Sequence, residues 1–588
     1  MARSENNLNA VFTDTAKAIQ DAEQNWDTKI CPRNFATHIN NLPIAHIANA
    51  PHLNLYLDFD SAGTTFYKWY TAVTYSQGNP GTRPEVGGSV WLDNIPEALE
   101  LAYARVRGNW SVNYKKKSLK LKFASKVNLL GLNNGKKAKD WLLLANYNDN
   151  SGLRNALGFY MGQLLFKHTD QWAPTFTWVH VYVNNDYLGL YLLCDQKEVN
   201  ESRININEPK KTAEYPEGYP GTDVGYFFER DDYWNTYFDI PEEEKDPGFM
   251  IEYPTEYFDH NGDTAVLPIN NSEEFSHSTS PKGSGYGVNF YHGSGAVGPS
   301  GAAKVDYYTI HSNIYSQDQI DFLKERMQLI YAILYEACKN NPVAYEIDEY
   351  NNLVPSQLTP QEAVAQVIDL DSFVNMIILC ELSGDPDLAH TSFFFTLDMS
   401  ATGDKKLKLN CPWDFDRAFG SCDGLSDASY STLWCAGVSY NPWVALLSNA
   451  PWNFRLAKAR WEELIQEEFM QKCLNFLDLA AYFYEEDFAR DNELYPVNYK
   501  YNGQTDPNII NMANMNSDFY QGFTTEYEAK EKLRNWLEIR INAVNTLCQT
   551  QLYPFTYYNN NKTMDNILAS QDWLNIDVRY EPIPEIIK

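Results

Sequence analysis

Apolar and polar residues alternate over much of the chain from about residue 52 to about residue 232, which is the pattern of half-buried β-strands. The clearest case is WVHVYV, then NND, then YLGLYLL at 178–193, where two alternating runs flank a polar turn and predict a hairpin. Residues 152–166 instead space their apolar side chains at helical intervals. The pattern therefore predicts an antiparallel sheet with one helix packed on it.

The second half of the chain is dominated by helical spacing. Long apolar-periodic runs occur at 318–339, 372–383, 443–449, 454–483 and 527–548. A sheet-rich first half joined to a helical second half predicts an α+β fold of two lobes, with a cleft between them.

Shifts in composition divide the chain further. Residues 233–305 are rich in Gly, Ser, Asp, Pro and Tyr, and a surface insertion is favoured there over a substrate lid. The predicted segments are a small helical module at 1–50, a sheet-rich N-lobe at 51–232, the insertion at 233–305, a helical C-lobe with the catalytic loop at 306–550, and a C-terminal extension at 551–588.

Charge and cysteine usage exclude several classes of function. A formal net charge of −30 repels nucleic acid and anionic lipid, and favours a cationic protein partner. The apolar runs fall far short of the roughly 20 residues that span a bilayer. The nine cysteines include no C-x-x-C pair, which argues against a zinc site or a disulfide framework. The N-terminus shows no signal-peptide pattern, which leaves either a removed signal or a chain kept in a cytoplasm, and a secreted, surface or virion-associated location is the expectation.

The candidate catalytic and metal-binding carboxylates follow a helix and a strand in the second half of the chain. Asp387 lies where a helix ending at Ser383 gives way, through Gly384 and Pro386, to an aromatic strand. A loop carboxylate between rigid elements is a favoured catalytic position. The alternative is that Asp387 only caps a turn.

A second acidic motif follows in KLKLNCPWDFDRAFG, where a short strand is expected to end in Asp414 and Asp416. Alternate strand residues share a face, so these two carboxylates can hold Mg²⁺ against phosphate oxygens. The alternative is that they bind neighbouring backbone amides or Arg417.

The first half offers cationic groups for a phosphate. RVRGNWSVNYKKKSLKLKF combines Arg107, a flexible turn at Gly108 and a lysine cluster leading a strand. In strand phase Lys117 shares its face with Leu119 and Leu121, so Lys117 is selected as the phosphate-binding lysine. A solvated basic strand face is the alternative. Arg154, one turn into a predicted helix, can reach a phosphate or pair with an acidic neighbour.

These segments resemble a known family. RVRGNWS, KKSLKLKF, KDWLLLANYNDNSGLRNALGFYMG, VHVYVNNDYLGLYLLCDQ, VGYFFERDD, ELSGDPDLAHTSFFFTLD and PWDFDRAFG occur in the order of the CotH kinase family, over about residues 50 to 465. The resemblance implies an atypical, protein kinase-like fold that uses ATP and Mg²⁺ (or Mn²⁺) to phosphorylate Ser or Thr of proteins, including spore-coat proteins. It also implies that Asp387 is the catalytic aspartate and Asp414 a metal ligand.

Two departures from that pattern keep a second hypothesis open. Protein kinases place Asn five residues after the catalytic Asp, and this chain has Ser392 there, a poorer ligand for the metal. Asp195 stands where many relatives have Glu. In addition, residues 12–42 resemble a module of phage tail and surface proteins. The alternative to a kinase acting on a coat or virion protein is therefore a weak or inactive structural protein of a virion or bacterial surface.

Overall fold

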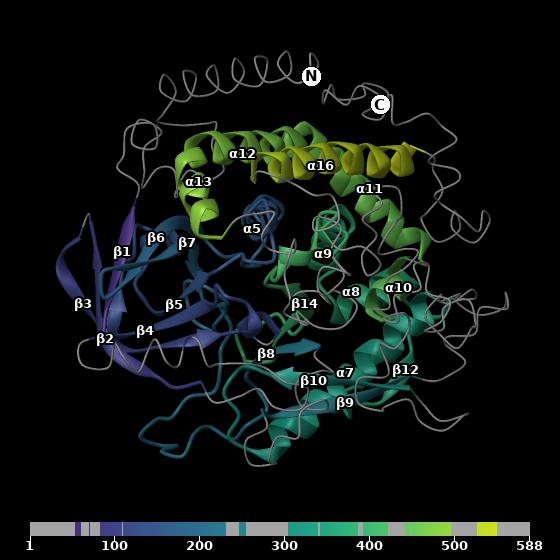
Figure 1. Cartoon of the computed structure of the whole chain (residues 1–588). Helices are drawn as coiled ribbons and strands as arrows, with labels where there is room; N and C mark the ends of the chain where they lie inside the picture. Colours follow the sequence, from purple (N-terminus) through teal and green to yellow (C-terminus); the bar gives the residue numbers. More distant parts are fainter. Residues whose placement is uncertain are drawn as a thin grey trace.

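The computed structural model describes two sheets and a set of helices (Figure 1). The residues that it describes are 53–59, 70, 83–93, 95–108, 110–230, 246–253, 304–338, 342–385, 392–421, 442–448, 450–495 and 526–549. The predicted module at 1–50 and extension at 551–588 lie outside these residues, as does most of the predicted insertion at 233–305.

The alternating first half folds into a closed barrel of seven strands. Its strands run in the order β1-β2-β3-β4-β5-β7-β6, and a parallel pairing between β1 and β6 closes it. The bounds are β1 Asn54–Asp58, β2 Val86–Leu92, β3 Ile95–Arg107, β4 Ser118–Val127, β5 Ala138–Leu144, β6 Phe176–Val183 and β7 Asp186–Asp195. The predicted hairpin is confirmed as β6 and β7, and Asn184 and Asn185 take the positive φ angles that its tight turn requires.

The barrel has two differently buried faces, because successive strand residues point to opposite sides. Trp141, Leu143 and Val181 lie in the barrel interior. Leu142 and Trp178 point outward instead and join the main core around the helices. Strands β5, β7 and β6 are thus apolar on both faces, and the barrel is fixed to the rest of the protein along them.

The other half of the molecule contains a second sheet of five antiparallel strands. Its order is β14-β13-β8-β10-β9. The bounds are β8 Gly225–Arg230, β9 Gly248–Tyr253, β10 Lys304–Ile310, β13 Phe393–Asp398 and β14 Leu407–Asn410, with a separate hairpin of β11 Tyr345–Ile347 and β12 Leu353–Pro355. Strand β9 falls inside the range predicted as an insertion.

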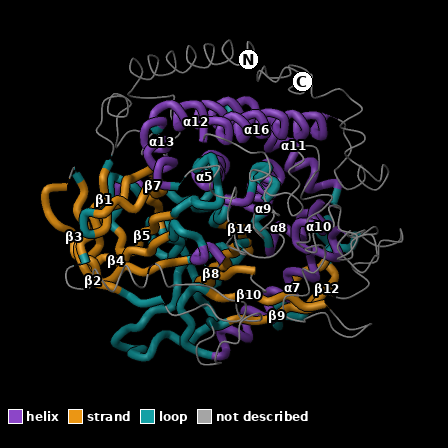
Figure 2. Tube along the Cα trace, viewed as in Figure 1, coloured by secondary structure: helices purple, strands orange, loops and turns teal. Residues whose placement is uncertain are grey.

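The helices gather on one side of the barrel and over the second sheet (Figure 2). They are α5 Arg154–Leu165, α7 Gln317–Cys338, α8 Pro360–Val367, α9 Leu370–Ser383, α10 Pro442–Ser448, α11 Pro451–Gln466, α12 Phe469–Phe483, α13 Glu485–Leu494 and α16 Glu526–Gln549. Every residue of α5 is buried, and α5 packs against α9 and α12. The helix predicted at 152–166 is confirmed as α5.

The predicted α+β class is confirmed, with two differences from the expected form. The first-half sheet closes into a barrel, and the second half contributes sheet strands as well as helices. A kinase-like division into two lobes stays a prediction. Within the described residues, no helix is both long enough and apolar enough to span a membrane.

Candidate active site

Asp414 and Asp416 lie in a tight turn beyond the second sheet. Strand β14 ends at Asn410, and Asp414 has a left-handed φ of 67° immediately before the 3₁₀ turn Phe415–Arg417. The expectation that the strand continues to these aspartates is wrong, because Pro412 has no N–H to continue a strand pairing. Nevertheless, both carboxylates line one hollow of about 460 Å³.

Helix α5 holds this turn in place. The Phe415 N–H donates to Asn155 Oδ1 at 2.8 Å, and Arg154 Nε donates to the Ala418 carbonyl at 3.1 Å. A Cβ on Gly158 would overlap the Phe415 ring, and one on Gly162 would lie 2.6 Å from Pro412 Cγ. The two glycines of GFYMG therefore let the segment carrying the aspartates lie directly on the helix.

Arg107 faces the aspartates from the barrel. Ala104 and Val106 point into the barrel interior, so Arg105 and Arg107 point outward. Arg107 lines the same hollow as Asp414, and its Cζ is 5.6 Å from the centre of the Trp413 ring. Burial lowers the pKa of Arg107, while Asp414 and Asp416 act in the opposite direction. Residues far apart in the sequence thus meet with complementary charge.

Gly108 makes the turn that follows Arg107. Its φ is 109°, a conformation that side chains disfavour, and a Cβ there would collide with Ser111 Oγ. The predicted turn is therefore present, and it places Ser111 beside Arg107 on the wall of the hollow.

The lysine cluster does not project as one face. Lys117 is buried, its ammonium donates to the Val112 carbonyl, and its backbone N–H donates to Tyr70 Oη at 2.8 Å. Burial lowers the pKa of Lys117 to about 8. Because Val112 and Tyr70 belong to the barrel core, the Lys117 side chain lies at the end of the barrel interior. Its role in phosphate binding stays a prediction, and the neighbouring Lys116 lines the hollow.

Arg154 is fully buried and paired. Its Nη1 lies 2.5 Å from Asp149 Oδ1, in addition to its bond to the Ala418 carbonyl. This is the acidic pairing weighed from the sequence, and contact of Arg154 with a cofactor stays a prediction.

The structure describes the chain up to Asp385 and again from Ser392, so Asp387 lies outside the described residues. The surrounding elements are as predicted: α9 ends at Ser383, Gly384 has a left-handed φ of 56°, and strand β13 follows. The Ser392 backbone N–H donates to Glu229 Oε1 at 2.7 Å. A metal-binding role for Ser392 stays a prediction.

Two charged residues at this site were missed from the sequence, namely Lys197 and Glu229. Lys197 Nζ lies 3.6 Å from Glu229 Oε2 and 3.7 Å from the centre of the Phe394 ring. His311 Nε2 contacts the same Glu229 oxygen at 2.8 Å. The available signal was a charged residue inside the buried strand run GYFFER, since buried charges require partners.

The electrostatics of Asp414 depend on these neighbours. Burial raises the pKa of Asp414, while Arg107 and Lys197 act against that effect and Glu229 reinforces it. A metal cation bound at Asp414 would favour the ionised form of this buried carboxylate.

The pair of carboxylates suits magnesium. Mg²⁺ is usually held by one or two protein carboxylates together with phosphate oxygens and water. In the part of the chain that the structure describes, no group of three or more His, Cys, Asp and Glu side chains could hold a metal. If Asp414 and Asp416 hold Mg²⁺, the remaining ligands would be phosphate oxygens and water.

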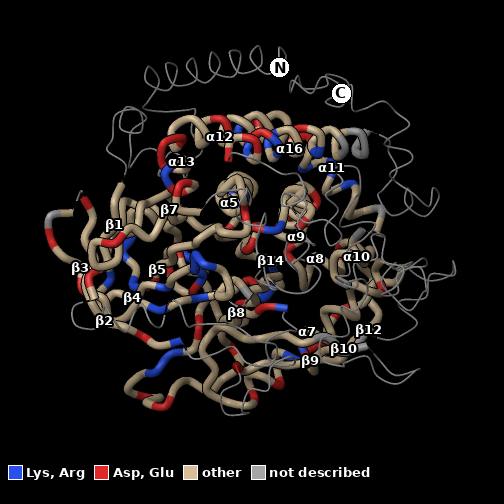
Figure 3. Tube along the Cα trace, in the orientation of Figure 1, with Lys and Arg blue, Asp and Glu red and all other residues tan. Residues whose placement is uncertain are grey.

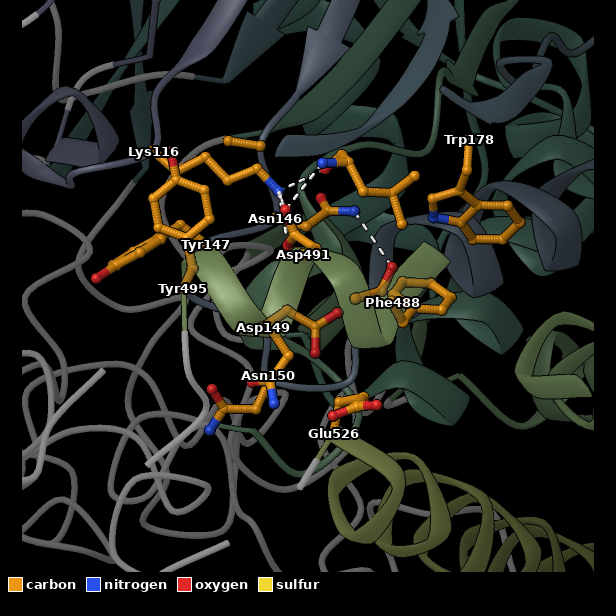
Figure 4. A pocket seen from close by; sticks show the side chains of 14 residues that line it. Lys116, Asn146, Tyr147, Asp149, Asn150, Trp178, Phe488, Asp491, Tyr495 and Glu526 are labelled. Carbon is orange, nitrogen blue, oxygen red and sulfur yellow. Dashed lines mark hydrogen bonds and ion pairs between the residues drawn. The ribbon is translucent and has the colours of Figure 1, made fainter. Parts of the chain in front are cut away.

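A second hollow of about 440 Å³ adjoins the first (Figure 4). The two share Lys116, Asn146 and Tyr147 in their walls. Lys116 Nζ lies 2.9 Å from both oxygens of Asp491, which comes from α13. Trp178 and Phe488 line the opposite side.

A family model matches the sequence. The sequence model of a family described as "CotH kinase protein" matches residues 104–258 and 344–543, together more than half of the chain. These ranges include Arg107, Arg154 and Asp414. No curated protein matches the sequence.

Proposed function

Because the chain belongs to the CotH kinase protein family, we propose that it transfers the γ-phosphate of ATP to a Ser or Thr hydroxyl of a protein. Family membership supports a kinase-like function. The finer choice of nucleotide and acceptor rests on the resemblance of its motifs and on the chemistry of the hollow.

One observation carries this proposal: Arg107 of the barrel faces Asp414 and Asp416 across a hollow open to solvent. Phosphoryl transfer requires mainly the positioning and electrostatic stabilisation of charged phosphates, with cations on one side and metal-binding carboxylates on the other. The hollow supplies both from separate parts of the fold.

The residues have distinct roles in this proposal. Asp414 and Asp416 would hold Mg²⁺ or Mn²⁺, which would neutralise charge on the phosphate oxygens. Arg107 binds phosphate oxygens, and Lys197 adds positive charge beside Asp414. The α5 contacts to Phe415 and Ala418 keep the carboxylates at a fixed place.

In the transfer, the acceptor hydroxyl oxygen forms a bond to the γ-phosphorus, and the bond from that phosphorus to the β-phosphate oxygen breaks, which leaves ADP. The hydroxyl proton passes to a carboxylate, for which we propose Asp387 by resemblance. A coat or virion protein is the proposed acceptor, and a surface or virion location is part of the same proposal.

Labelled phosphate transfer by the full chain tests this function. Wild type, Asp414→Asn and an exposed control, Asp371→Asn, are incubated with Mg²⁺, γ-labelled ATP and casein as acceptor. We expect labelling of casein or of the chain itself by wild type and the control, and a loss of about 100-fold or more in Asp414→Asn. The melting temperature of Asp414→Asn should not fall by more than about 3 °C, since burial already disfavours the charged carboxylate.

Two results would contradict the proposal. One is the absence of any metal-dependent labelling by wild type, which would favour the non-catalytic alternative. The other is undiminished transfer by Asp414→Asn, which would move the reaction away from this hollow.

A further inference from the structure

Arg83 lies beside the end of the strand that carries Arg107. Val86 of β2 pairs with Ala104 of β3, and the two strands run antiparallel. Residues before Val86 therefore run alongside residues after Ala104. Glu85 shows this directly, because its Oε1 lies 3.7 Å from Arg105 Nη1.

Arg83 joins Arg105 and Arg107 to form a cluster of three arginines, called here the arginine cluster. Arg105 and Arg107 share the outer face of β3, since Ala104 and Val106 occupy its inner face. Burial, together with repulsion from Arg105 and Arg107, lowers the pKa of Arg83 to about 10. The strand register and the repulsion felt by Arg83 thus place the three side chains near one another.

Two nitrogens of Arg83 lack acceptors. Nε and Nη2 are both buried, and among the described residues neither has a hydrogen-bond partner. Leaving buried donors unsatisfied costs free energy, and such groups call for an explanation, of which a bound ion or water is one. The cluster belongs to a chain of net charge −30, and acidic positions occur in many of the elements drawn in Figure 3.

We propose that the arginine cluster binds a phosphate group, with Arg83 as a ligand. A guanidinium presents paired N–H donors that match two oxygens of a phosphate, and clustered cations favour a dianion over a single carboxylate. The carboxylate of Glu85, at 3.7 Å from Arg105, balances one of the three charges. Asp414 and Asp416 face Arg107 but are the proposed metal ligands.

This inference deepens the proposed function and rests on it for the source of the phosphate. The phosphate belongs either to the nucleotide or to a phosphorylated residue of the acceptor, and the chemistry of recognition is the same. Arg83 precedes residue 104, where the family match begins, so the match does not assign it a role.

Binding measurements on the full chain test the arginine cluster without requiring catalysis. The probes are sodium tripolyphosphate, Mg²⁺-ATP, and one peptide in phosphoserine and unmodified serine forms, each titrated by calorimetry at low salt. The variants are Arg83→Gln, Arg83→Lys and an exposed control, Arg455→Gln on α11. Melting temperatures check that each variant is folded.

We expect Arg83→Gln to weaken tripolyphosphate binding by about tenfold or more, while Arg455→Gln leaves it unchanged. Arg83→Lys should lie between them, because it keeps the charge but loses the paired donors. An equal loss for Mg²⁺-ATP identifies the nucleotide as the source. A loss for the phosphoserine peptide alone identifies the acceptor.

Unchanged binding of every phosphate probe by a folded Arg83→Gln variant would overturn the inference. If Arg83 governs tripolyphosphate binding but no labelled phosphate is ever transferred, the proposed kinase function fails while the phosphate site stands. If transfer occurs and depends on Asp414 but not on Arg83, the proposed kinase function stands while the phosphate site fails.

Discussion

Glu229 keeps its charge inside the protein because three partners surround it. Burial by itself would raise its pKa, but Lys197, His311 and the Ser392 N–H together lower the pKa of Glu229 to about 2. Its ordinary value is 4.5, so folding favours the ionised form. Such a group stabilises the fold fully above its unfolded pKa, and this contribution is lost as pH falls toward the folded pKa.

Glu229→Gln should therefore destabilise the protein in a pH-dependent way. At pH 7 we expect the free energy of unfolding to fall by roughly 2–3 kcal/mol, since Lys197 loses its counter-charge in a buried place. Between about pH 5 and pH 2 the difference from wild type should shrink. Urea unfolding at pH 7 and pH 3 measures this difference in the free energy of unfolding, and exposed Glu325→Gln is the control. A difference that grows on acidification would contradict this account.

Individual residues of the site could be predicted where the sequence showed a local motif. Asp414 and Asp416 were chosen as alternate residues of a strand that in fact ends at Asn410, and Arg107 from its place before a glycine turn; the functional roles of all three stay predictions. Glu229 could not be chosen in the same way, because its role depends on Lys197 and His311, which come from separate elements. Only the folded arrangement brings these charges together.

At the scale of elements, α5 and the turn that carries the aspartates form one unit. Gly158 allows the Phe415 ring to rest on the helix backbone, and Asn155 and Arg154 bind the turn at both ends. The position of both carboxylates therefore depends on a helix that contributes neither of them.

Gly158→Ala should displace the turn. The added methyl overlaps the Phe415 ring, so we expect a loss of roughly 1–3 kcal/mol in stability. Phosphate transfer should fall more than stability alone would explain, since catalysis tolerates little misplacement. Pairing the change with Phe415→Leu should restore part of both losses. The control is Gly87→Ala on β2, where the nearest atom to a Cβ is 3.6 Å away.

Thermal melting and transfer assays on these variants provide the measurement. If Gly158→Ala matched Gly87→Ala in both, the close approach of helix and turn would not matter for the site.

Elements were more predictable than their assembly. Alternation predicted the strands of the first half, and helical spacing predicted α5 within the same region. Closure of the barrel depends on the parallel pairing of Leu55 with Val181, which lie far apart in the chain. Local periodicity specifies which residues face inward but not which distant strand completes the ring.

At the scale of the whole molecule, α13 fastens the helical part to the barrel. Asp491 accepts from the Leu190 N–H at 2.8 Å and pairs with the buried Lys116. On the same helix, Asp487 contacts His180 Nε2 at 2.6 Å, and Arg490 donates to Tyr182 Oη at 2.7 Å. Figure 1 shows α13 above strands β6 and β7. Since Lys116 also lines both hollows, this junction and the site share a residue.

Asp491→Asn should loosen this junction. The amide leaves Lys116 buried without its counter-charge, which we expect to cost roughly 2–3 kcal/mol. Amide hydrogen exchange should accelerate in α13 and β7 while the second sheet keeps its protection. The control is Glu493→Gln, an exposed residue on the same helix. Exchange that rises equally throughout the protein would argue against a local fastening.

The ring of seven strands also sets where the chain can be cut. The family match starts at residue 104, near the end of β3, whereas β1 and β2 come earlier and complete the ring. A fragment trimmed to the matched residues would lose β1, β2 and most of β3. Strands β4 and β6 would then have unpaired edges that can pair with other chains and cause aggregation. Fragments intended for expression therefore have to begin upstream of Asn54, although the family match does not include those first strands.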